Sequence, residues 1–339
     1  MTPPPLFPKN CAERRQNSCS RTQSDNPVIK LSSGRLPTLA NLLPSCHNGQ
    51  ALPPPLPFGF PVPLDVLLFV LFGALLHAGW NAMVKAGTDK SLDAAMIALG
   101  AAVIALPFLP FMPLPDARAV PFLLASAMLQ FGYFHLVAAA YTAGDIGLVY
   151  PLMRGGAPLL IAATSSLIVG ERLSQGASLG ILAISAGIFT LAFEARRSGT
   201  RAIVIALVNA LFIAAYTYVD GIGARISGNA ISYTLWMALL PPVLLFGWAI
   251  SQRGAAPVLR HIRHNGWRGL VGGAGSIGSY GIALWAMTKA PVATVAALRE
   301  TSILFAIVIS VTVLKERISA FRIAAACLIA LGALLLKLA

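Results

Sequence analysis

Two arginines lie deep inside long apolar stretches, where a charged side chain is unusual. Arg154 and Arg299 each stand about eight residues into such a stretch, or about 12 Å along a helix axis. At the centre of a bilayer an arginine costs about 2.5–3.5 kcal/mol, so it turns toward other helices and finds a partner there. A guanidinium group in a low-dielectric pocket holds a carboxylate or a phosphate through paired N–H bonds. The chemistry that these two residues suggest is therefore the binding of an anion.

Two acidic residues give the same arginines a second interpretation. Glu300 follows Arg299 directly, so the two side chains point about 100° apart around a helix. Asp220 stands near the end of another apolar run. Either carboxylate could form a structural ion pair with an arginine, because charges inside a membrane usually pair with one another. The sequence leaves both interpretations open, and it also leaves open whether Asp220 lies at the membrane interface.

A set of polar and aromatic residues interrupts the apolar runs and could line a cavity. Trp80 and Asn81 stand in the first run and Tyr150 in a later one. Tyr216 and Thr217 match Trp80 and Asn81 when the second half of the chain is laid on the first. The alternative is hydrogen bonding between helices, which such residues provide at modest energies. The match between the halves favours a cavity lining for Trp80 and Asn81.

The elements that carry these residues follow from the composition. The chain has 339 residues, of which 57% are hydrophobic and only 11% charged, and its mean hydropathy is +0.75. A soluble domain carries roughly 25% charged residues, so a water-soluble enzyme is nearly excluded. Disorder requires low hydrophobicity and is excluded for most of the length. The net charge of +13 does not indicate nucleic-acid binding, because Lys and Arg stand in short clusters between apolar runs. The pattern predicts a multi-pass membrane protein.

Ten apolar segments are long enough to cross a bilayer, which takes about 20 residues in a helix. They lie near 65–86, 93–112, 118–141, 146–169, 175–194, 201–222, 231–250, 267–288, 291–314 and 319–338. The longest break between them runs from Ser251 to Trp267. Backbone groups inside lipid must all bond internally. The predicted fold class is therefore all-α, a bundle of ten transmembrane helices.

The chain repeats itself. Residues 141–194 laid on residues 286–339 without gaps pair Arg154 with Arg299, Glu171 with Glu316, Arg172 with Arg317, Ser174 with Ser319 and Gly187 with Gly332. Residues 64–194 and 201–339 are therefore predicted to be two copies of one five-helix unit. Because each copy has an odd number of spans, the second copy enters the membrane from the opposite side. Inverted repeats with a site between them near the midplane are typical of secondary transporters.

The junctions between apolar runs carry a more specific resemblance. Gly170-Glu171-Arg172-Leu173-Ser174 and Lys315-Glu316-Arg317-Ile318-Ser319 close the fourth helix of each copy, and a helix rich in small residues follows each junction. In these features residues 65–339 resemble the EamA-type transporters of the drug/metabolite transporter superfamily. Glu171 and Glu316 are interpreted as structural residues that anchor loops through hydrogen bonds to neighbouring helix termini.

The resemblance implies ten helices around a central cavity and the export or exchange of a small organic metabolite by alternating access. The arginines add the expectation of a carboxylate on that metabolite. The expected substrate-binding residues are Arg154, Arg299, Trp80, Asn81, Tyr216, Thr217 and Tyr150, and the expected coupling or gating residues are Glu300 and Asp220. The expected partners are a small-molecule substrate and the lipid bilayer, without nucleic acid; the sequence does not decide whether the chain forms a homodimer.

Three other functions stay open as alternatives. A lipid-carrier flippase and a non-transporting scaffold would use the same fold. An intramembrane enzyme is a weaker alternative, because no HExxH, GxSxG or paired membrane aspartates occur. No cofactor or metal site is expected: the GxGxxG match at Gly273–Gly278 has no preceding strand and lies in an apolar helix.

The first 63 residues differ from the rest in being rich in proline and basic residues. They are predicted to be either a disordered tail or a non-native translated segment. The expected location is the bacterial inner membrane. Lysine and arginine in the core loops place the loops after odd-numbered spans in the cytoplasm. The family resemblance implies cytoplasmic termini instead, so the orientation stays open.

Overall fold

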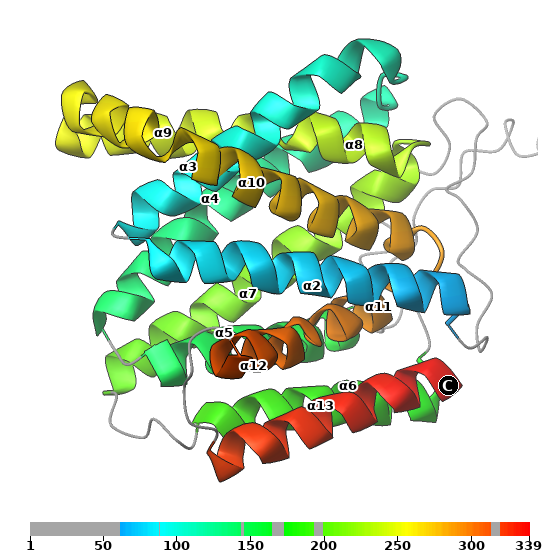
Figure 1. The fold of residues 1–339 in the computed structure, drawn as a ribbon. Helices are drawn as coiled ribbons and strands as arrows, with labels where there is room; N and C mark the ends of the chain where they lie inside the picture. Colours follow the sequence, from blue (N-terminus) through cyan, green and yellow to red (C-terminus); the bar gives the residue numbers. More distant parts are fainter. Residues whose placement is uncertain (1–61, 88, 144–145, 165–172, 193–198, 313–318) are drawn as a thin grey trace, which may run out of the picture. The chain divides into compact units, whose positions relative to one another are not determined.

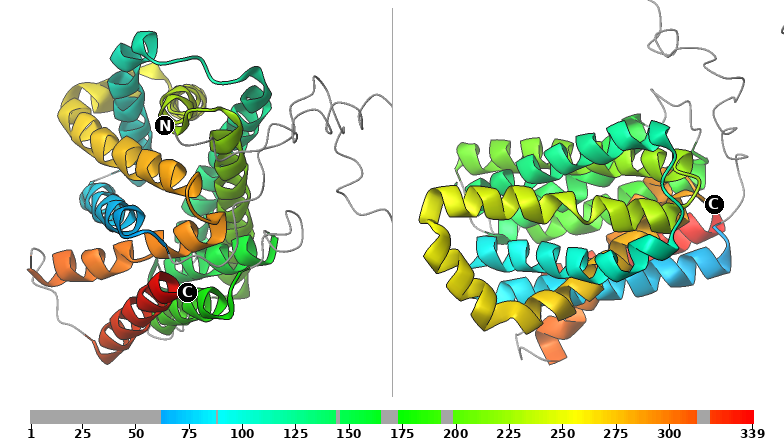
Figure 2. Two further views of the ribbon diagram at one scale, coloured as in Figure 1. Left: turned by 90° about the vertical axis from the view of Figure 1, so that its right-hand side faces the viewer. Right: turned by 90° about the horizontal axis from the view of Figure 1, so that it is seen from above.

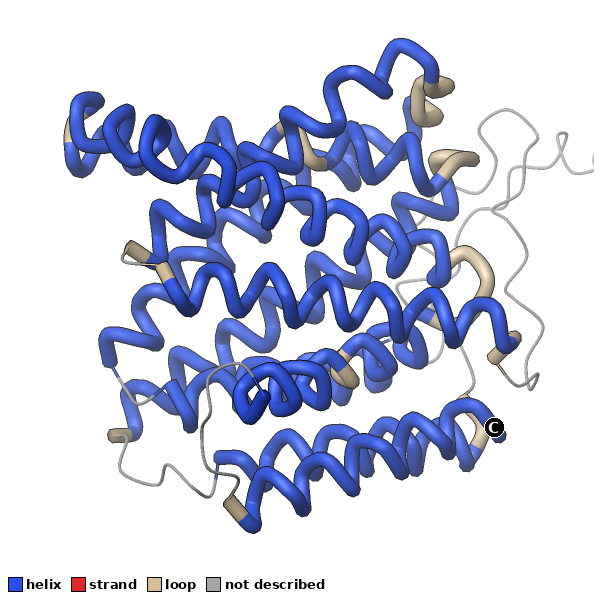
Figure 3. The backbone as a smooth tube through the Cα atoms, viewed as in Figure 1, coloured by secondary structure: helices blue, strands red, loops and turns tan. Residues whose placement is uncertain are grey.

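The computed structural model describes residues 62–87, 89–143, 146–164, 173–192, 199–312 and 319–339. These residues form helices and short connections, with no strand among them (Figures 1 and 3). The α-helices are α2 (Leu64–Ala86), α3 (Lys90–Ala105), α4 (Val120–Ala143), α5 (Ile146–Thr164), α6 (Gln175–Ala192), α7 (Thr200–Ile226), α8 (Ala230–Met237), α9 (Leu240–Arg253), α10 (Ala255–Met287), α11 (Val292–Arg299), α12 (Ser302–Thr312) and α13 (Ala320–Leu338). Two 3₁₀ helices, η2 (Leu106–Phe111) and η3 (Ala117–Ala119), lie between α3 and α4. The predicted all-helical class is confirmed.

Some predictions fall on residues that the structure does not describe. Glu171 and Glu316, with their predicted loop-anchoring role, lie outside the described ranges, as does nearly all of the predicted tail.

Within the described ranges, eight helical segments are long and apolar enough to cross a membrane. They are Leu64–Val84, Lys90–Phe111, Ala117–Val137, Thr200–Ile226, Ala230–Arg253, Ala255–Met287, Val292–Ile309 and Ala320–Leu338. The fourth predicted span is occupied by α5, and the fifth by the shorter apolar helix Gln175–Leu191. Most of these helices run along one common direction when seen from above (Figure 2, right). Large apolar side chains such as Phe111, Val243 and Leu338 are exposed, as expected of a surface that faces lipid.

The prediction of a long break between helices from Ser251 to Trp267 is wrong, because most of this segment is helical. α9 ends at Arg253, Gly254 has a φ of +78°, and α10 begins at Ala255. A single glycine with left-handed backbone reverses the chain here, since glycine adopts positive φ without a steric penalty. The polar residues that suggested a loop lie largely on exposed faces of the helix, where they do not oppose helix formation.

Two of the spans are each built from two shorter helices. α8 ends at Met237, and α9 begins with Pro241 and Pro242 in its first turn, where a missing N–H is tolerated. α11 and α12 are separated by Glu300 and Thr301, whose N–H groups donate to carbonyl oxygens only three residues back, at 3.0 and 3.1 Å. Tightened 3₁₀ turns inside a helix often mark a hinge or a functional position.

Glycines bring two pairs of helices into close contact. The carbonyl oxygen of Gly269 in α10 occupies the space that a Cβ on Gly100 in α3 would need. α6 and α13 lie side by side (Figure 1), and a Cβ on Gly332 would stand 2.6 Å from the carbonyl oxygen of Gly180. Small residues let membrane helices approach closely and pack well in lipid.

We expect Gly332→Ala to destabilise the protein, because the added methyl group has no room between α6 and α13. Overpacking of this kind costs about 1–3 kcal/mol, so the thermal unfolding midpoint in detergent should fall. Gly247→Ala is the matched control, because nothing lies within 4 Å of a Cβ at that helical position. Equal unfolding midpoints for the two variants would contradict the close contact.

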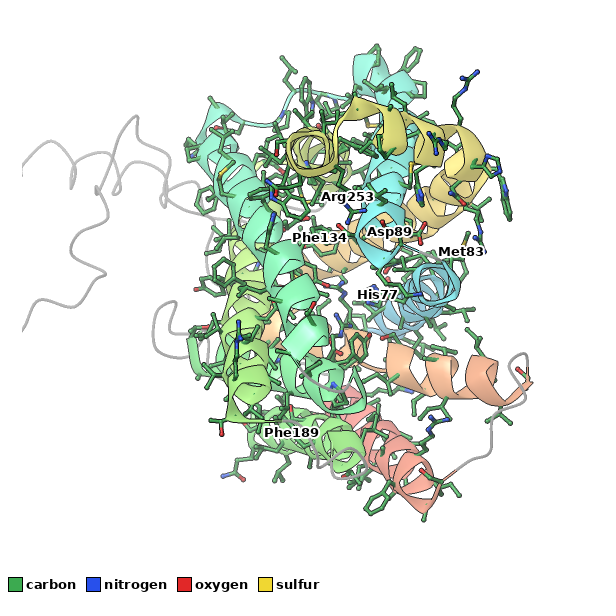
Figure 4. All side chains as sticks on the ribbon, turned by 90° about the vertical axis from the view of Figure 1, so that its left-hand side faces the viewer. His77, Met83, Asp89, Phe134, Phe189 and Arg253 are labelled. Atoms are coloured by element: carbon green, nitrogen blue, oxygen red, sulfur yellow. The ribbon has the colours of Figure 1, made fainter. Side chains whose placement is uncertain are left out.

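An exposed ion pair lies at the end of the bundle where α2 ends and α3 begins, which is called here the Asp89 end. Asp89 caps α3 by accepting the Leu92 N–H at 3.1 Å, and it pairs with Arg253 at the end of α9 (Figure 4). Partial burial works to raise the pKa of Asp89, but the hydrogen bonds from Leu92 and Arg253 outweigh it and hold the pKa below its usual value. The pair therefore stays charged at neutral pH and joins α3 to α9.

Candidate functional site

A cavity lies among the middle turns of the helices, with about 120 Å³ open to water-sized groups. Its polar and aromatic lining consists of His77, Trp80, Gln130, Tyr133, Phe134, Arg154, Tyr216, Thr234, Ser276, Tyr280 and Arg299. The other lining residues are small or apolar. Helices from both predicted repeats contribute to this wall. An apolar cavity with a few convergent polar groups is the usual form of a small-molecule site.

Arg154 is one of the two cations in the lining, and a carboxylate neutralises it. It stands in α5, between Pro151 and Pro158. Its Nε lies 2.9 Å from Oε2 of Glu300, and the two side chains are only 8% and 7% exposed. The Nη2 atom of Arg154 is buried and has no hydrogen-bond partner among the described residues. Glu300 therefore balances the charge of Arg154, but the Nη2 donor stays without an acceptor. A buried donor without a partner is costly, so this atom is a candidate to bind an acceptor group on a ligand.

Arg299 is the second cation, and an aromatic ring supports it. It ends α11, and its guanidinium carbon lies 5.0 Å from the centre of the Tyr280 ring. A guanidinium group over a ring is attracted by the negative face of the ring, which orients it without neutralising it. Within the described part of the chain, no carboxylate lies within ion-pair distance of Arg299. Arg299 thus forms no direct ion pair among the described residues, although Asp220 and Glu300 lie near enough to interact with its charge.

Asp220 lies in the protein interior and not at an exposed membrane interface. It stands in α7 with none of its surface exposed. The hydroxyl groups of Tyr233 and Tyr280 donate to its two oxygens at 3.0 and 2.6 Å, and Ser126 is a further hydrogen-bond partner. Tyr280 therefore joins the buried carboxylate to the cation, because its hydroxyl contacts Asp220 while its ring faces Arg299.

The predicted substrate-binding residues fall into two groups. Arg154, Arg299, Trp80 and Tyr216 line the central cavity. Asn81 and Tyr150 do not; they line two neighbouring cavities, and the Asn81 side chain donates to the backbone oxygen of His77 at 2.7 Å. Thr217 is 2% exposed and lines none of these cavities. Asn81 and Thr217 stand one residue along a helix from Trp80 and Tyr216, so their side chains point about 100° away.

One neighbouring cavity leads from the central cavity toward the Asp89 end of the bundle. It shares Trp80, Tyr133 and Phe134 with the central cavity and continues to Lys90 and Ser91 at the start of α3. His135 and Trp248 form an aromatic contact in its wall, with ring centres 4.4 Å apart. The two cavities therefore adjoin at Trp80, Tyr133 and Phe134, and their combined lining reaches from the Asp89 end to the two arginines.

Several lining residues were not among the predicted substrate-binding residues. Tyr280 is the most important, because it contacts both Arg299 and Asp220. It lies in the glycine- and serine-rich stretch of α10, which the sequence identified only as part of an apolar helix. Gln130 and Thr234 are also in the wall, on α4 and α8. The sequence did contain a signal for these residues, because polar and aromatic side chains are rare in such apolar spans. That signal does not show which face of the helix each side chain occupies.

Comparison with known proteins agrees with this fold. A solved structure titled "Crystal structure of protein" has a TM-score of 0.62 to this chain at 19% sequence identity, and the alignment covers 81% of this chain and 96% of that one. At this identity the likeness concerns the fold alone. No curated protein matches the chain.

A family model gives the more specific result. Residues 200–338, which run from the first residue of α7 to the last of α13, match the model of the EamA-like transporter family. The predicted resemblance is therefore confirmed for this part of the chain, and eight apolar helices of membrane-spanning length agree with it. Residues 200–338 are thus similar to the EamA-like transporter family, a match that supports a membrane transporter of small molecules, and the eight apolar helices support an integral, multi-pass membrane protein.

Proposed function

We propose that this protein moves a small organic anion, most simply a carboxylate, through the cavity between Arg154 and Arg299. The observation that carries the proposal is that two arginines line one cavity. Arg299 forms no direct ion pair among the described residues, and Nη2 of Arg154 has no hydrogen-bond partner among them. Desolvated cations are costly in an apolar interior unless an anion binds them. A substrate carboxylate supplies that anion and accepts paired N–H bonds from a guanidinium group.

The remaining lining supports an apolar or planar body on the substrate. Trp80, Tyr133, Phe134, Tyr216 and Tyr280 present rings to the cavity, and ring contacts stabilise flat, apolar groups. Tyr216 lies 5.7 Å from Tyr133 and 6.4 Å from Tyr280 between ring centres, so three of these rings form one cluster. The preferred substrate class is therefore a carboxylate with an aromatic or bulky apolar group.

Alternating access is the mechanism that fits a site of this kind. The inverted repeats inferred from the sequence, residues 64–194 and 201–339, would each contribute one arginine to the site. Glu300 pairs with Arg154 and lies in the tightened turn between α11 and α12. An incoming carboxylate would compete with Glu300 for Arg154, and this exchange of partners could change the conformation at the turn. Glu300 and Asp220 are the carboxylates available for coupling to protons.

The direction of transport that we propose is export or exchange across a bacterial inner membrane, as the family resemblance implies. The route from the Asp89 end to the central cavity is the path by which substrate would enter or leave the conformation described here.

The proposal is tested with the purified full chain in proteoliposomes. Vesicles preloaded with metabolite extract are assayed for exchange with a labelled aryl carboxylate, its neutral amide, the corresponding amine and a small hydrophilic carboxylate. We expect the aryl carboxylate to exchange fastest and the amide and amine to remain near the rate of empty vesicles. Equal exchange of the acid and its amide would contradict the anion site, and faster exchange of the hydrophilic acid would contradict the aromatic preference.

A further inference from the structure

α10 is longer than a bilayer needs. It has 33 residues, which is about 50 Å of helix at about 1.5 Å per residue. The hydrocarbon core of a bilayer is about 30 Å thick. The part from Arg268 to Met287 alone is about 30 Å long. The first part, Ala255 to Trp267, therefore extends beyond the hydrocarbon into the headgroup region at the Asp89 end.

This first part carries a cationic face. Arg260, Arg263, His264 and Trp267 follow the spacing that places residues on one side of a helix, and all four are exposed, Trp267 by 65%. The guanidinium carbon of Arg268 lies 6.0 Å from the Trp267 ring centre. No Asp or Glu occurs anywhere in residues 251–290. The face of Arg260, Arg263, His264 and Trp267, called here the α10 basic face, has no acidic residue on its own helix to balance it.

The other side of the same segment is fixed to the protein. Val258 is 1% exposed and packs in a small cluster with Leu92 and Ala249. His261 lies 2.9 Å from Asp93 of α3. These contacts hold the segment in place, so the orientation of the α10 basic face does not depend on a mobile loop.

We propose that the α10 basic face binds the phosphate of an anionic phospholipid headgroup. The complementary charge is the main argument, because clusters of arginine just outside a transmembrane segment attract anionic lipid. Trp267 supplies a second argument, because exposed tryptophan is typical of the membrane–water interface. Trp267 is also the last residue of the first part of α10. Exposed Leu270 and Val271 follow it and face the acyl chains.

Lipid enrichment around the reconstituted protein tests this proposal. The full chain is placed in nanodiscs that contain phosphatidylcholine with a minor fraction of phosphatidylglycerol, and spin-labelled versions of each lipid are used to quench tryptophan fluorescence. The Trp267 contribution is obtained by subtracting the signal of Trp267→Phe. We expect stronger Trp267 quenching by the anionic lipid, and Arg260→Gln with Arg263→Gln should weaken the preference by about five- to thirtyfold.

A charge-matched control separates a site from general attraction. Arg118→Gln with Lys289→Gln removes two exposed charges near the opposite end of the bundle, and it should leave the Trp267 preference unchanged. Equal quenching by the two lipids, equal loss in both double variants, or full competition by inorganic phosphate in place of lipid would overturn the proposal. Because the readout is lipid contact and not transport, it is independent of the substrate that the protein moves.

Discussion

Replacing Arg299 with glutamine is expected to lower transport of the anionic substrate about 10- to 100-fold at subsaturating concentration while the protein remains folded. Hydrogen bonds to charged groups contribute about 1.5–3 kcal/mol, and every 1.4 kcal/mol is tenfold. Among the described residues the guanidinium group of Arg299 forms no direct ion pair, so its removal leaves no directly paired carboxylate behind. The loss should therefore appear in substrate affinity and transport and not in stability.

The measurement is exchange in proteoliposomes, with the thermal unfolding midpoint recorded on the same preparation. Arg299→Lys keeps the charge but loses the planar, paired donors, and it should recover only part of the activity. Arg118→Gln is the control, because that arginine lies at the surface beside Asp116. Wild-type exchange by Arg299→Gln would remove this residue from the site.

Separating Arg154 from Glu300 is expected to have the largest effect on stability. Arg154→Ala leaves the Glu300 carboxylate buried without its cation, and Glu300→Gln leaves the guanidinium group without its anion. Removing one member of a buried pair typically costs about 3–5 kcal/mol. Both single variants should therefore express poorly and unfold at clearly lower temperature than wild type.

The double variant Arg154→Met with Glu300→Leu tests whether the loss of stability comes from the unpaired buried charge. Replacing a buried pair by apolar residues of similar size is often neutral for stability, so the double variant should recover the unfolding temperature. It should not recover transport, because the Arg154 donors are gone. Single variants as stable as wild type would show that the pair is not buried in the membrane, and a double variant that transports normally would show that Arg154 does not bind substrate.

The two arginines could be predicted from the sequence as candidate site residues, whereas their interaction partners could not. A charge in an apolar run is costly wherever the run lies, so Arg154 and Arg299 can be singled out without a structure. Their partners depend on which helices are neighbours. Glu300 pairs with Arg154 across 146 positions of sequence and not with the arginine beside it, because adjacent residues on a helix face different neighbours.

The helical class of the elements could be predicted, but their interruptions could not. Apolar length predicts a span, and all ten predicted segments contain helix. Apolar length does not reveal that α8 and α9 are separate helices, or that the chain tightens at Glu300. The basic stretch from Ser251 suggested a loop because polar residues are rare inside lipid. It is helical, and α10, at about 50 Å, is longer than the hydrocarbon core requires, so polar residues in its first part need not lie inside lipid.

The glycine contacts constrain how the protein can move. α3 touches α10 through Gly100 and Gly269, and α6 touches α13 through Gly180 and Gly332. At each contact one helix comes from residues 64–194 and the other from 201–339, and a backbone carbonyl oxygen of one helix lies against a glycine of the other. Sliding one half of the sequence over the other would shear both contacts. These contacts oppose a movement of one half of the sequence against the other, whereas the cavity where Arg154 meets Glu300 is lined by side chains, which can repack.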